Sequence, residues 1–309
     1  MPNISIVVPT YNESGNVDKL AKEITDVLKK DDFEIIFVND GSVDNSLEKI
    51  KKLASNNEKV KYVSFSRNFG HQAALRAGLK AAKGNAVVSM DADLQHPPSM
   101  LPELISKWRN DGYDVVYTIR KDTSDTGLLK RTTSTWFYRV VNFLSGLKIE
   151  EGAADFRLLD RKVIDVINAQ SESNIFLRGY ISWMGFKQIG IPYKPAKRFS
   201  GKSNYTVKKM LALAGTGVTQ FSLKPLRLAF SFASIAFIAS IIYVIYAIVV
   251  AITGGSVPGW LSLVVLLVFL QGTQFLLLGL IGEYLGRTFM QTKSRPEYIV
   301  ADSSDGYDK

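Results

Sequence analysis

Positions 228–282 of this 309-residue chain contain no charged residue. The uncharged block is 55 residues long, and the stretch TGGSVPG at 253–259 divides it into two segments, 228–252 and 260–282. A helix needs about 20 apolar residues to cross a bilayer. Both segments exceed that length, so the block predicts two transmembrane helices joined by a short turn. The alternative is a buried helical hairpin in a soluble protein, but helices that are apolar on every side would exceed what an ordinary core can cover.

Basic residues flank the block on its outer sides. Lys224 and Arg227 precede it, Arg287, Lys293 and Arg295 follow it, and the turn between the two segments carries no charge. The positive-inside rule therefore places both ends of the block in the cytoplasm. The amino-terminal sequence MPNISIVVPTYNE lacks the basic region that precedes the apolar part of a signal peptide. We expect an integral membrane protein with two spans and with both termini cytoplasmic.

The chain accordingly divides into three predicted parts. Residues 1–225 form a cytosolic domain, residues 226–286 a transmembrane hairpin and residues 287–309 a cytosolic tail. The absence of cysteine excludes disulfides and thiolate metal ligands, and two histidines argue against a structural zinc site. The formal net charge of +9 indicates an anionic partner, which leaves a nucleic acid, a phosphorylated ligand and a lipid surface open.

Short apolar runs alternate with helical patterns over the first 120 residues. The runs predict strands at 4–8, 33–38, 60–65, 86–90 and 114–118, and the patterns between them predict helices at 15–30, 44–55, 70–82 and 98–110. Near-continuous β-branched runs separated by helices are typical of a parallel sheet that is covered on both faces. In such sheets, ligands bind at the carboxyl ends of the strands.

Polar residues follow the ends of four predicted strands. They are Glu13 after the first strand, Asp40 and Asp44 after the second, Arg67 after the third, and Asp91 and Asp93 after the fourth. Any one of them can be explained as a loop residue or a helix cap, and Asp44 directly precedes a predicted helix. Their gathering on one edge of a parallel sheet nevertheless predicts a ligand site.

Two nucleotide-binding motifs are absent. The loop PTYNESGN after the first strand lacks the Gly-x-Gly-x-x-Gly pattern, and GKS at 201–203 lacks the P-loop glycine because Ala196 occupies its position. Asp91 and Asp93 instead indicate a divalent cation, since Mg²⁺ prefers oxygen ligands and often combines one or two carboxylates with substrate phosphates. Gln95 adds a neutral oxygen two residues further on.

The motifs VVPTYNE, VNDGSVDNS, RNFGHQAAL, MDADLQHPP and FRLLDR together resemble the family-2 glycosyltransferases with a GT-A fold. More narrowly, they resemble polyprenyl-phosphate glycosyltransferases such as dolichol-phosphate mannose synthase and the bacterial undecaprenyl-phosphate glucosyltransferases of the GtrB type. The resemblance runs through almost the whole chain, including RFSGKSNY and the two apolar segments. It implies an α/β GT-A domain, a Rossmann-like nucleotide-diphospho-sugar transferase fold with a mostly parallel sheet, followed by interfacial helices and two carboxyl-terminal transmembrane helices.

The resemblance also implies roles for individual residues. The nucleotide sugar would contact Pro9, Tyr11, Glu13, Asp40, Arg67 and Asp91, and a Mg²⁺ or Mn²⁺ ion would be held by Asp91, Asp93 and Gln95. The catalytic residues would be Asp93 and Asp155, with Asp155 near the acceptor as the candidate base. The phosphates and the lipid acceptor would contact Arg120, Arg131, Arg198, Lys202, Ser203 and Tyr205. Asp155 also has a structural interpretation, as an ion-pair partner of Arg157 or as a helix cap. His96 stands where relatives commonly have an acid or an amide, and it receives no role.

The implied chemistry needs no strong base. A lipid phosphate is already largely ionised near pH 7, because the second pKa of such groups is about 6. Arginine can position it beside another anion through bidentate pairing, and a metal can neutralise the charge that develops on a nucleoside diphosphate leaving group. A single in-line displacement predicts inversion at the anomeric carbon.

Two segments are expected to meet the membrane surface. Between positions 174 and 227 there are ten basic residues and no acidic ones, which is typical of a segment lying on an anionic leaflet, although a solvated basic face is the alternative. Amphipathic interfacial helices are predicted near 204–222 and 130–147, and the second is equally consistent with an ordinary core-facing helix. The segment 198–205 is predicted to be a loop that closes over phosphates, and a basic surface loop is the alternative.

We therefore expect an inverting, metal-dependent hexosyltransferase (EC 2.4.1 class) that transfers glucose from UDP-glucose to undecaprenyl or another polyprenyl phosphate at the cytoplasmic membrane face. GDP-mannose and a UDP-amino sugar are alternative donors, and a non-catalytic sugar-nucleotide-binding scaffold is an alternative of a different class. A processive polysaccharide synthase is disfavoured because the chain lacks a Gln-x-x-Arg-Trp motif. The expected partners are a nucleotide sugar, the lipid phosphate, the membrane and further copies of the chain, with no nucleic acid.

Overall fold

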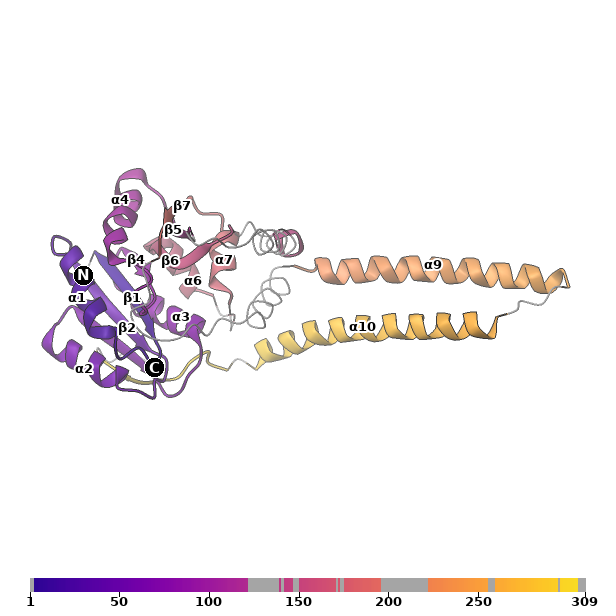
Figure 1. The fold of residues 1–309 in the computed structure, drawn as a ribbon, viewed down its shortest axis with the longest axis horizontal. Helices are drawn as coiled ribbons and strands as arrows, with labels where there is room; N and C mark the ends of the chain where they lie inside the picture. Colours follow the sequence, from indigo (N-terminus) through magenta and orange to yellow (C-terminus); the bar gives the residue numbers. More distant parts are fainter. Residues whose placement is uncertain are drawn as a thin grey trace.

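The computed structural model combines an α/β body with a long helical hairpin that projects from one side of it (Figure 1). The structure describes residues 3–121, 139, 142–146, 150–170, 172, 175–195, 222–254, 259–293 and 295–304. The predicted α/β fold class with a mostly parallel sheet, followed by two long apolar helices, is confirmed.

One eight-stranded sheet runs through the described residues of the body, in the order β7-β5-β6-β4-β1-β2-β3-β8. The strands are β1 (Ile4–Thr10), β2 (Phe33–Asn39), β3 (Val60–Phe65), β4 (Ala86–Ser89), β5 (Val115–Arg120), β6 (Ala153–Asp160), β7 (Gln188–Tyr193) and β8 (Val300–Ser303). The central strands β4, β1, β2 and β3 are mutually parallel, and β7 is parallel to β5. β6 is antiparallel to both β4 and β5, and β8 is antiparallel to β3.

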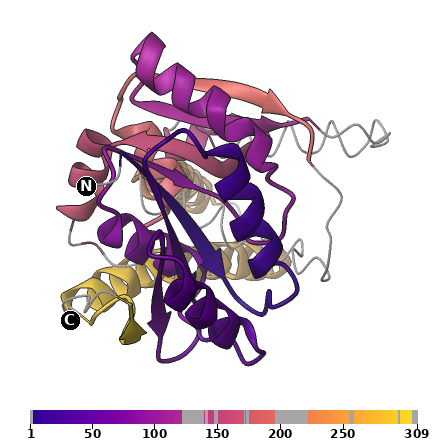
Figure 2. The same cartoon turned by 90° about the vertical axis from the view of Figure 1, so that its left-hand side faces the viewer.

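Helices cover both faces of the sheet, as Figure 2 shows from the end opposite the hairpin. The helices are α1 (Val17–Val27), α2 (Ser46–Asn56), α3 (His71–Ala81), α4 (Leu101–Asp111, after a 3₁₀ turn at Pro98–Met100), α6 (Arg161–Asn168) and α7 (Leu177–Trp183). One core contains buried residues of α1, α2 and α4, and the other contains those of α3, α6 and α7. Ile6 and Val7 of β1 point into different cores, which explains why the central strands read as continuous apolar runs.

The nine elements predicted within the first 120 residues are confirmed, with ends that differ by three residues or fewer. The remaining elements of the body, β6, β7, β8, α6 and α7, were not predicted from the sequence. The predicted interfacial helix at 130–147 is described only at residue 139 and at 142–146, where residues 142–145 are helical. The predicted interfacial helix at 204–222 lies outside the described residues except for its last residue.

The hairpin consists of α9 (Lys224–Ile252) and α10 (Trp260–Thr292). Each helix is long and apolar enough to cross a membrane, over Lys224–Val250 and Leu266–Thr292, and neither stretch is buried inside the protein. Phe230, Ile252 and Leu276 are 74%, 80% and 78% exposed. A soluble protein rarely exposes so large a continuous apolar surface, so the alternative of a buried hairpin is wrong and the two helices are candidate membrane spans.

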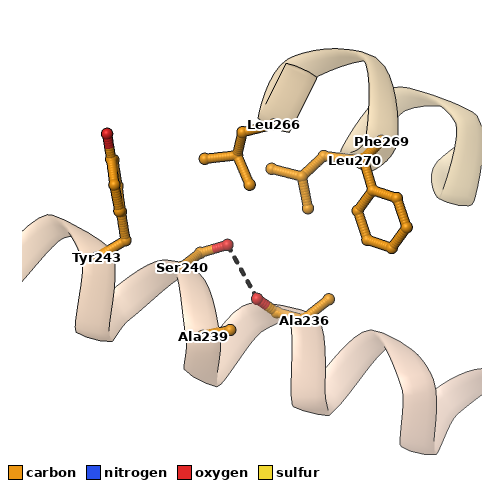
Figure 3. Close-up of a pocket in the computed structure, with 7 residues that line it drawn as sticks. All are labelled: Ala236, Ala239, Ser240, Tyr243, Leu266, Phe269 and Leu270. Carbon is orange, nitrogen blue, oxygen red and sulfur yellow. Dashed lines mark hydrogen bonds between the residues drawn. The ribbon is translucent and has the colours of Figure 1, made fainter. Parts of the chain in front are cut away.

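A cavity of about 460 Å³ lies between the two candidate spans (Figure 3). Its walls are formed by Ala236, Ala239, Ser240 and Tyr243 of α9 and by Leu266, Phe269 and Leu270 of α10. The Ser240 hydroxyl donates to the carbonyl of Ala236 at 2.9 Å, so this polar group is satisfied within its own helix. The lining is therefore mostly apolar, as expected where two apolar helices pack against each other.

Candidate active site

The antiparallel strand β6 brings distant residues to the edge of the sheet where the parallel strands end. Arg157 of β6 pairs with Ser89 of β4, so the residues before Arg157 lie beside the residues that follow β4. The Ser89 hydroxyl donates to the carbonyl of Asp155 at 2.5 Å, which fixes this approach. The predicted metal residues Asp91 and Asp93 and the predicted acceptor residue Asp155 consequently share one edge, together with the ends of β1 and β2.

The turn that carries Asp91 and Asp93 is held in an uncommon conformation. Leu94 has a φ of +62°, a left-handed conformation that is costly for a bulky side chain. The Asp93 carboxylate accepts a hydrogen bond from the Gln95 backbone amide at 3.0 Å. Asp93 is only 8% exposed, whereas the Asp91 side chain is 39% exposed. The turn therefore presents Asp91 to a ligand and uses Asp93 partly to hold its own shape.

His96, which received no role from the sequence, holds this turn against the aromatic side chains behind it. Its imidazole is 7% exposed and stacks on Phe156, with ring centroids 5.0 Å apart, and it meets Tyr193 edge-on at 5.9 Å. Its Nδ1 accepts a hydrogen bond from the Asp91 backbone amide at 2.9 Å. The aromatic partners lie far away in the sequence, so no local pattern could have revealed this role.

Replacing His96 with alanine should leave the Asp91 amide without its acceptor and open a cavity beside Phe156. We expect a loss of about 2 to 4 kcal/mol in unfolding free energy, measured by thermal unfolding in detergent. His96→Asn keeps an acceptor at a similar position and should restore part of that loss. Equal destabilisation by both substitutions would show that ring packing alone, and not the hydrogen bond, accounts for the contribution of His96.

Gln95 and Arg120, predicted as a metal ligand and as a phosphate contact, touch each other. An Arg120 guanidinium nitrogen donates to the Gln95 side-chain oxygen at 3.2 Å. Among the described residues, no group of three or more histidines, aspartates or glutamates is placed to hold a metal ion. The oxygen donors of Asp91 and Asp93 still fit a hard divalent cation that draws its other ligands from substrate phosphates and water. The described residues thus offer an incomplete ligand set, which a diphosphate would complete.

Asp155 lies within a cluster of positive charge. Arg178 of α7 forms a two-point contact with its carboxylate, at 3.1 and 3.3 Å, and Arg157 lies 3.2 Å from it. The Asp155 side chain is 19% exposed. Burial raises the pKa of Asp155, but Arg178 and then Arg157 outweigh burial and hold that pKa well below its usual range. The predicted ion pair with Arg157 is thus present, and Arg178 is a partner that the sequence analysis missed.

His71, the first residue of α3, is a second site residue that the sequence analysis missed. Its Nε2 lies 3.7 Å from an Asp91 carboxylate oxygen and 3.9 Å from one of Asp155. The imidazole is 43% exposed, so it borders open space between the two carboxylates. Its position in the motif RNFGHQAAL could have indicated a site residue, because His71 directly follows the loop after the third strand.

The predicted nucleotide-binding loops after β1 and β2 are joined to each other. The Asn12 backbone amide donates to the Ser42 hydroxyl, and the Asn12 side-chain oxygen accepts from the Val43 backbone amide at 2.9 Å. The Glu13 backbone amide donates to the Ser46 hydroxyl at 2.9 Å. Asp44 accepts from the backbone amides of Ser46, the first residue of α2, and of Ser14. The cap position of α2 is nevertheless held by Asn45, so Asp44 joins the two loops from one residue before the cap. Pro9 is buried within β1, whereas the Tyr11 ring is 45% exposed at the edge of the sheet.

Asp40 supports the loop that leads from β3 to α3. Its carboxylate accepts from the amides of Phe69 at 2.7 Å and Gly70 at 3.0 Å. Burial raises the pKa of Asp40, and these two hydrogen bonds partly offset the rise. Arg67 lies in the same loop, with its guanidinium 4.1 Å from the centre of the Phe69 ring. The loop thus connects two of the predicted nucleotide residues to the beginning of the helix that carries His71.

Five of the residues predicted to contact the phosphates and the lipid acceptor are not among those that the structure describes. Arg131, Arg198, Lys202, Ser203 and Tyr205 lie outside the described residues. For these positions the roles implied by resemblance stay predictions.

Comparison with known proteins identifies the family. The sequence model of glycosyl transferase family 2 matches residues 5–167, which is more than half of the chain. The chain belongs to glycosyl transferase family 2. The same comparison matches residues 224–288 of this family 2 protein to the GtrB C-terminal hairpin, a range that contains α9 and most of α10.

Full-length relatives support the assignment. The family 2 protein is 41% identical over 303 residues to the prophage bactoprenol glucosyl transferase homolog of Escherichia coli (strain K12), covering 96% of this chain and 98% of that protein. It is also 41% identical over 309 residues to the bactoprenol glucosyl transferase of Shigella phage SfII, with 98% and 99% covered. A further relative, the uncharacterized glycosyltransferase YkcC of Bacillus subtilis (strain 168), is 42% identical over 303 residues, with 97% and 93% covered.

A solved structure shares the fold. The mannosyltransferase PcManGT from Pyrobaculum calidifontis, in complex with GDP-Man and Mn²⁺, matches with a TM-score of 0.50 and 18% identity, covering 95% of this chain and 85% of that one. At this identity the likeness shows the GT-A fold of the family 2 protein and nothing about its substrate.

Proposed function

We propose that the protein transfers a hexose, glucose from UDP-glucose, to undecaprenyl phosphate or a similar polyprenyl phosphate at the cytoplasmic face of the membrane, with inversion at the anomeric carbon. The observation that carries the proposal is one edge of the sheet at which Asp91 lies beside the Arg178–Asp155 pair, with His71 between them. The edge belongs to a body that continues into two exposed apolar helices, which suits a substrate with a charged head and a lipid tail.

The donor would lie against the ends of β1, β2 and β4. The exposed ring of Tyr11 offers a stacking surface for a nucleobase, and Glu13, Asp40 and Arg67 are held in the loops around it. Asp91 and Asp93 would hold Mg²⁺ or Mn²⁺, which supplies charge neutralisation for a leaving diphosphate. Arg120, which contacts Gln95, would add a fixed positive charge beside the same phosphates.

The acceptor phosphate would lie on the other side of Asp91, where Arg178 and Arg157 provide positive charge. A phosphate oxygen forms a bond to the anomeric carbon as the bond from that carbon to the diphosphate oxygen breaks, and the electron pair leaves with the diphosphate. No proton must move, because the phosphate is largely ionised near pH 7. The strongly lowered pKa of Asp155 makes it a weak base. We therefore assign Asp155 to holding Arg178 and Arg157 rather than to abstracting a proton.

The relatives give independent support. Two of them are named bactoprenol glucosyl transferases or homologs and match nearly the full chain. GDP-mannose and a UDP-amino sugar, the alternative donors named from the sequence, are the further donors to test. The orientation with both termini cytoplasmic and the homo-oligomeric state stay predictions, and the first follows from the basic residues on either side of the hairpin.

A transfer assay tests the proposal. Purified protein, undecaprenyl phosphate, Mn²⁺ and radiolabelled UDP-glucose should give an organic-soluble labelled lipid, and mass spectrometry should show one added hexose. Parallel reactions with GDP-mannose and UDP-N-acetylglucosamine would identify a different donor. Nucleotide binding without a lipid product from any donor would support the non-catalytic scaffold and contradict the transferase proposal.

A further inference from the structure

The chain that follows the second candidate span returns to the α/β body and joins its sheet. Figure 1 shows this yellow segment running from α10 back to the body, beside α3. Strand β8 pairs with β3 and thereby covers a sheet edge that would otherwise be open. Tyr298 stacks on Phe65 with ring centroids 4.9 Å apart, and the Ser66 amide donates to the carbonyl of Ile299 at 3.0 Å. We refer to residues 295–304 as the carboxyl-terminal clasp.

Glu297 of the clasp forms an ion pair with Arg76 of α3. The two charged groups are 2.8 Å apart, and their side chains are only 10% and 14% exposed. An exposed pair of this kind would contribute little, but a largely buried one leaves an uncompensated charge if one partner is removed. The pair is therefore a fixed connection between the clasp and α3.

Arg76 continues this connection to the segment before α7. The same guanidinium donates to the backbone carbonyl of Glu172 at 2.6 Å and to that of Gln170 at 2.9 Å. One turn earlier on α3, the side chain of Gln72 accepts from the amide of Leu177, the first residue of α7, at 3.3 Å. One side of α3 thus contacts both the clasp and the chain that leads into α7.

The next residue of α7 is Arg178, which forms the two-point contact with Asp155. The first residue of α3 is His71, which lies beside both Asp155 and Asp91. The clasp is therefore connected, through α3 and α7, to the two residues that border the acceptor side of the candidate site. Its other anchor, Asp302, pairs with Lys51 of α2 at 2.6 Å and accepts from the Tyr62 hydroxyl, both away from α7.

We propose that Glu297 and Arg76 are positioning residues, which set the place of Arg178 at the acceptor side. This inference rests on the proposed function, because it assigns Arg178 to the acceptor phosphate. Glu297 carries no role in the chemistry itself. It neutralises Arg76, so that the guanidinium can remain buried while it holds the two carbonyls before α7.

The kinetic test compares Glu297→Gln with Asp302→Asn in the full-length protein, reconstituted in lipid nanodiscs. Glu297→Gln should raise the KM for undecaprenyl phosphate about tenfold, with a KM for the nucleotide sugar that changes less than about twofold. Asp302→Asn loosens the same clasp at its other anchor and should leave both KM values near those of the original protein. Glu297→Asp, which keeps the charge on a shorter side chain, should fall between the original protein and Glu297→Gln.

A structural readout keeps this inference separate from the proposed function. In hydrogen exchange followed by mass spectrometry, Glu297→Gln should speed exchange of peptides covering 175–183 about tenfold, while Asp302→Asn should speed only those of the clasp and β3. This measurement needs no substrate, so an inactive original protein would contradict the proposed function and leave the inference testable. Unchanged exchange at 175–183 in Glu297→Gln would overturn the inference, and so would an equal rise in both KM values.

Discussion

Replacing Asp91 with asparagine is expected to lower kcat/KM for sugar transfer by about 10²- to 10³-fold. Asp91 is the more exposed of the two carboxylates after β4, and its backbone is held by His96. Asparagine keeps the size of the side chain but removes the negative charge that would hold a divalent cation beside a diphosphate. The loss should be measured with labelled donor and polyprenyl phosphate over a range of Mn²⁺ concentrations.

The metal dependence distinguishes a lost ligand from a distorted turn. Weakened binding should shift half-maximal activity to higher Mn²⁺, so that high metal concentrations restore part of the rate. Asp111→Asn provides the matched control, since Asp111 lies at the exposed end of α4 and pairs with Lys107 on the surface. It should stay within about twofold of the original rate. Full turnover by Asp91→Asn, with an unchanged Mn²⁺ response, would contradict the metal assignment.

Replacing Asp155 with asparagine should produce the second large effect, on both stability and acceptor use. The substitution removes the carboxylate that neutralises Arg157 and Arg178, and the Arg157 side chain is only 6% exposed. We expect the unfolding free energy to fall by about 3 kcal/mol. The kcat/KM for the lipid phosphate should fall by about 10²-fold, while donor binding, followed by titration calorimetry, should change little. Arg178→Lys keeps a positive charge without the two-point contact and should lose less activity.

The pH dependence of rate separates a positioning carboxylate from a general base. Because the pKa of Asp155 is held well below its usual range, the group stays ionised throughout the assay range. The acid limb of kcat/KM should then reflect the lipid phosphate, with a pKa of about 6, and should run parallel in Asp155→Asn. An acid limb present in the original protein and absent from the variant would support the candidate-base interpretation instead.

The same pKa gives a stability prediction with a definite sign. The folded-state pKa of Asp155 lies below its unfolded value of about 3.9, so the stabilisation is complete above that value and is lost as the pH falls toward the folded pKa. The stability difference between the original protein and Asp155→Asn should be constant from pH 7 to 5 and smaller at pH 3. Thermal unfolding in detergent at these pH values provides the measurement, and a difference that grows toward acid pH would contradict it.

Much of the body follows from patterns that are local in the sequence. The strands at 4–8 and 33–38 are buried on both faces, so all their residues except Ser5 and Glu34 are apolar, and the apolar runs are easily recognised. β6 escaped prediction because it mixes charged and apolar residues, and Arg157 within it is buried against a carboxylate. β8 has four residues and gains its partner only by pairing with β3, more than 230 positions earlier.

The two long apolar helices, the βα alternation, the edge of the sheet on which the acids collect and the family could all be predicted from the sequence. These features depend on periodicity, length and motifs, which are read along the chain. The folded chain was needed to show that His71 and Arg178 border Asp155, that His96 holds the Asp91 turn and that Glu297 reaches Arg76. Those contacts join residues that are brought together by antiparallel pairing and by helix packing. No local pattern in the sequence shows which distant side chain neutralises a buried charge.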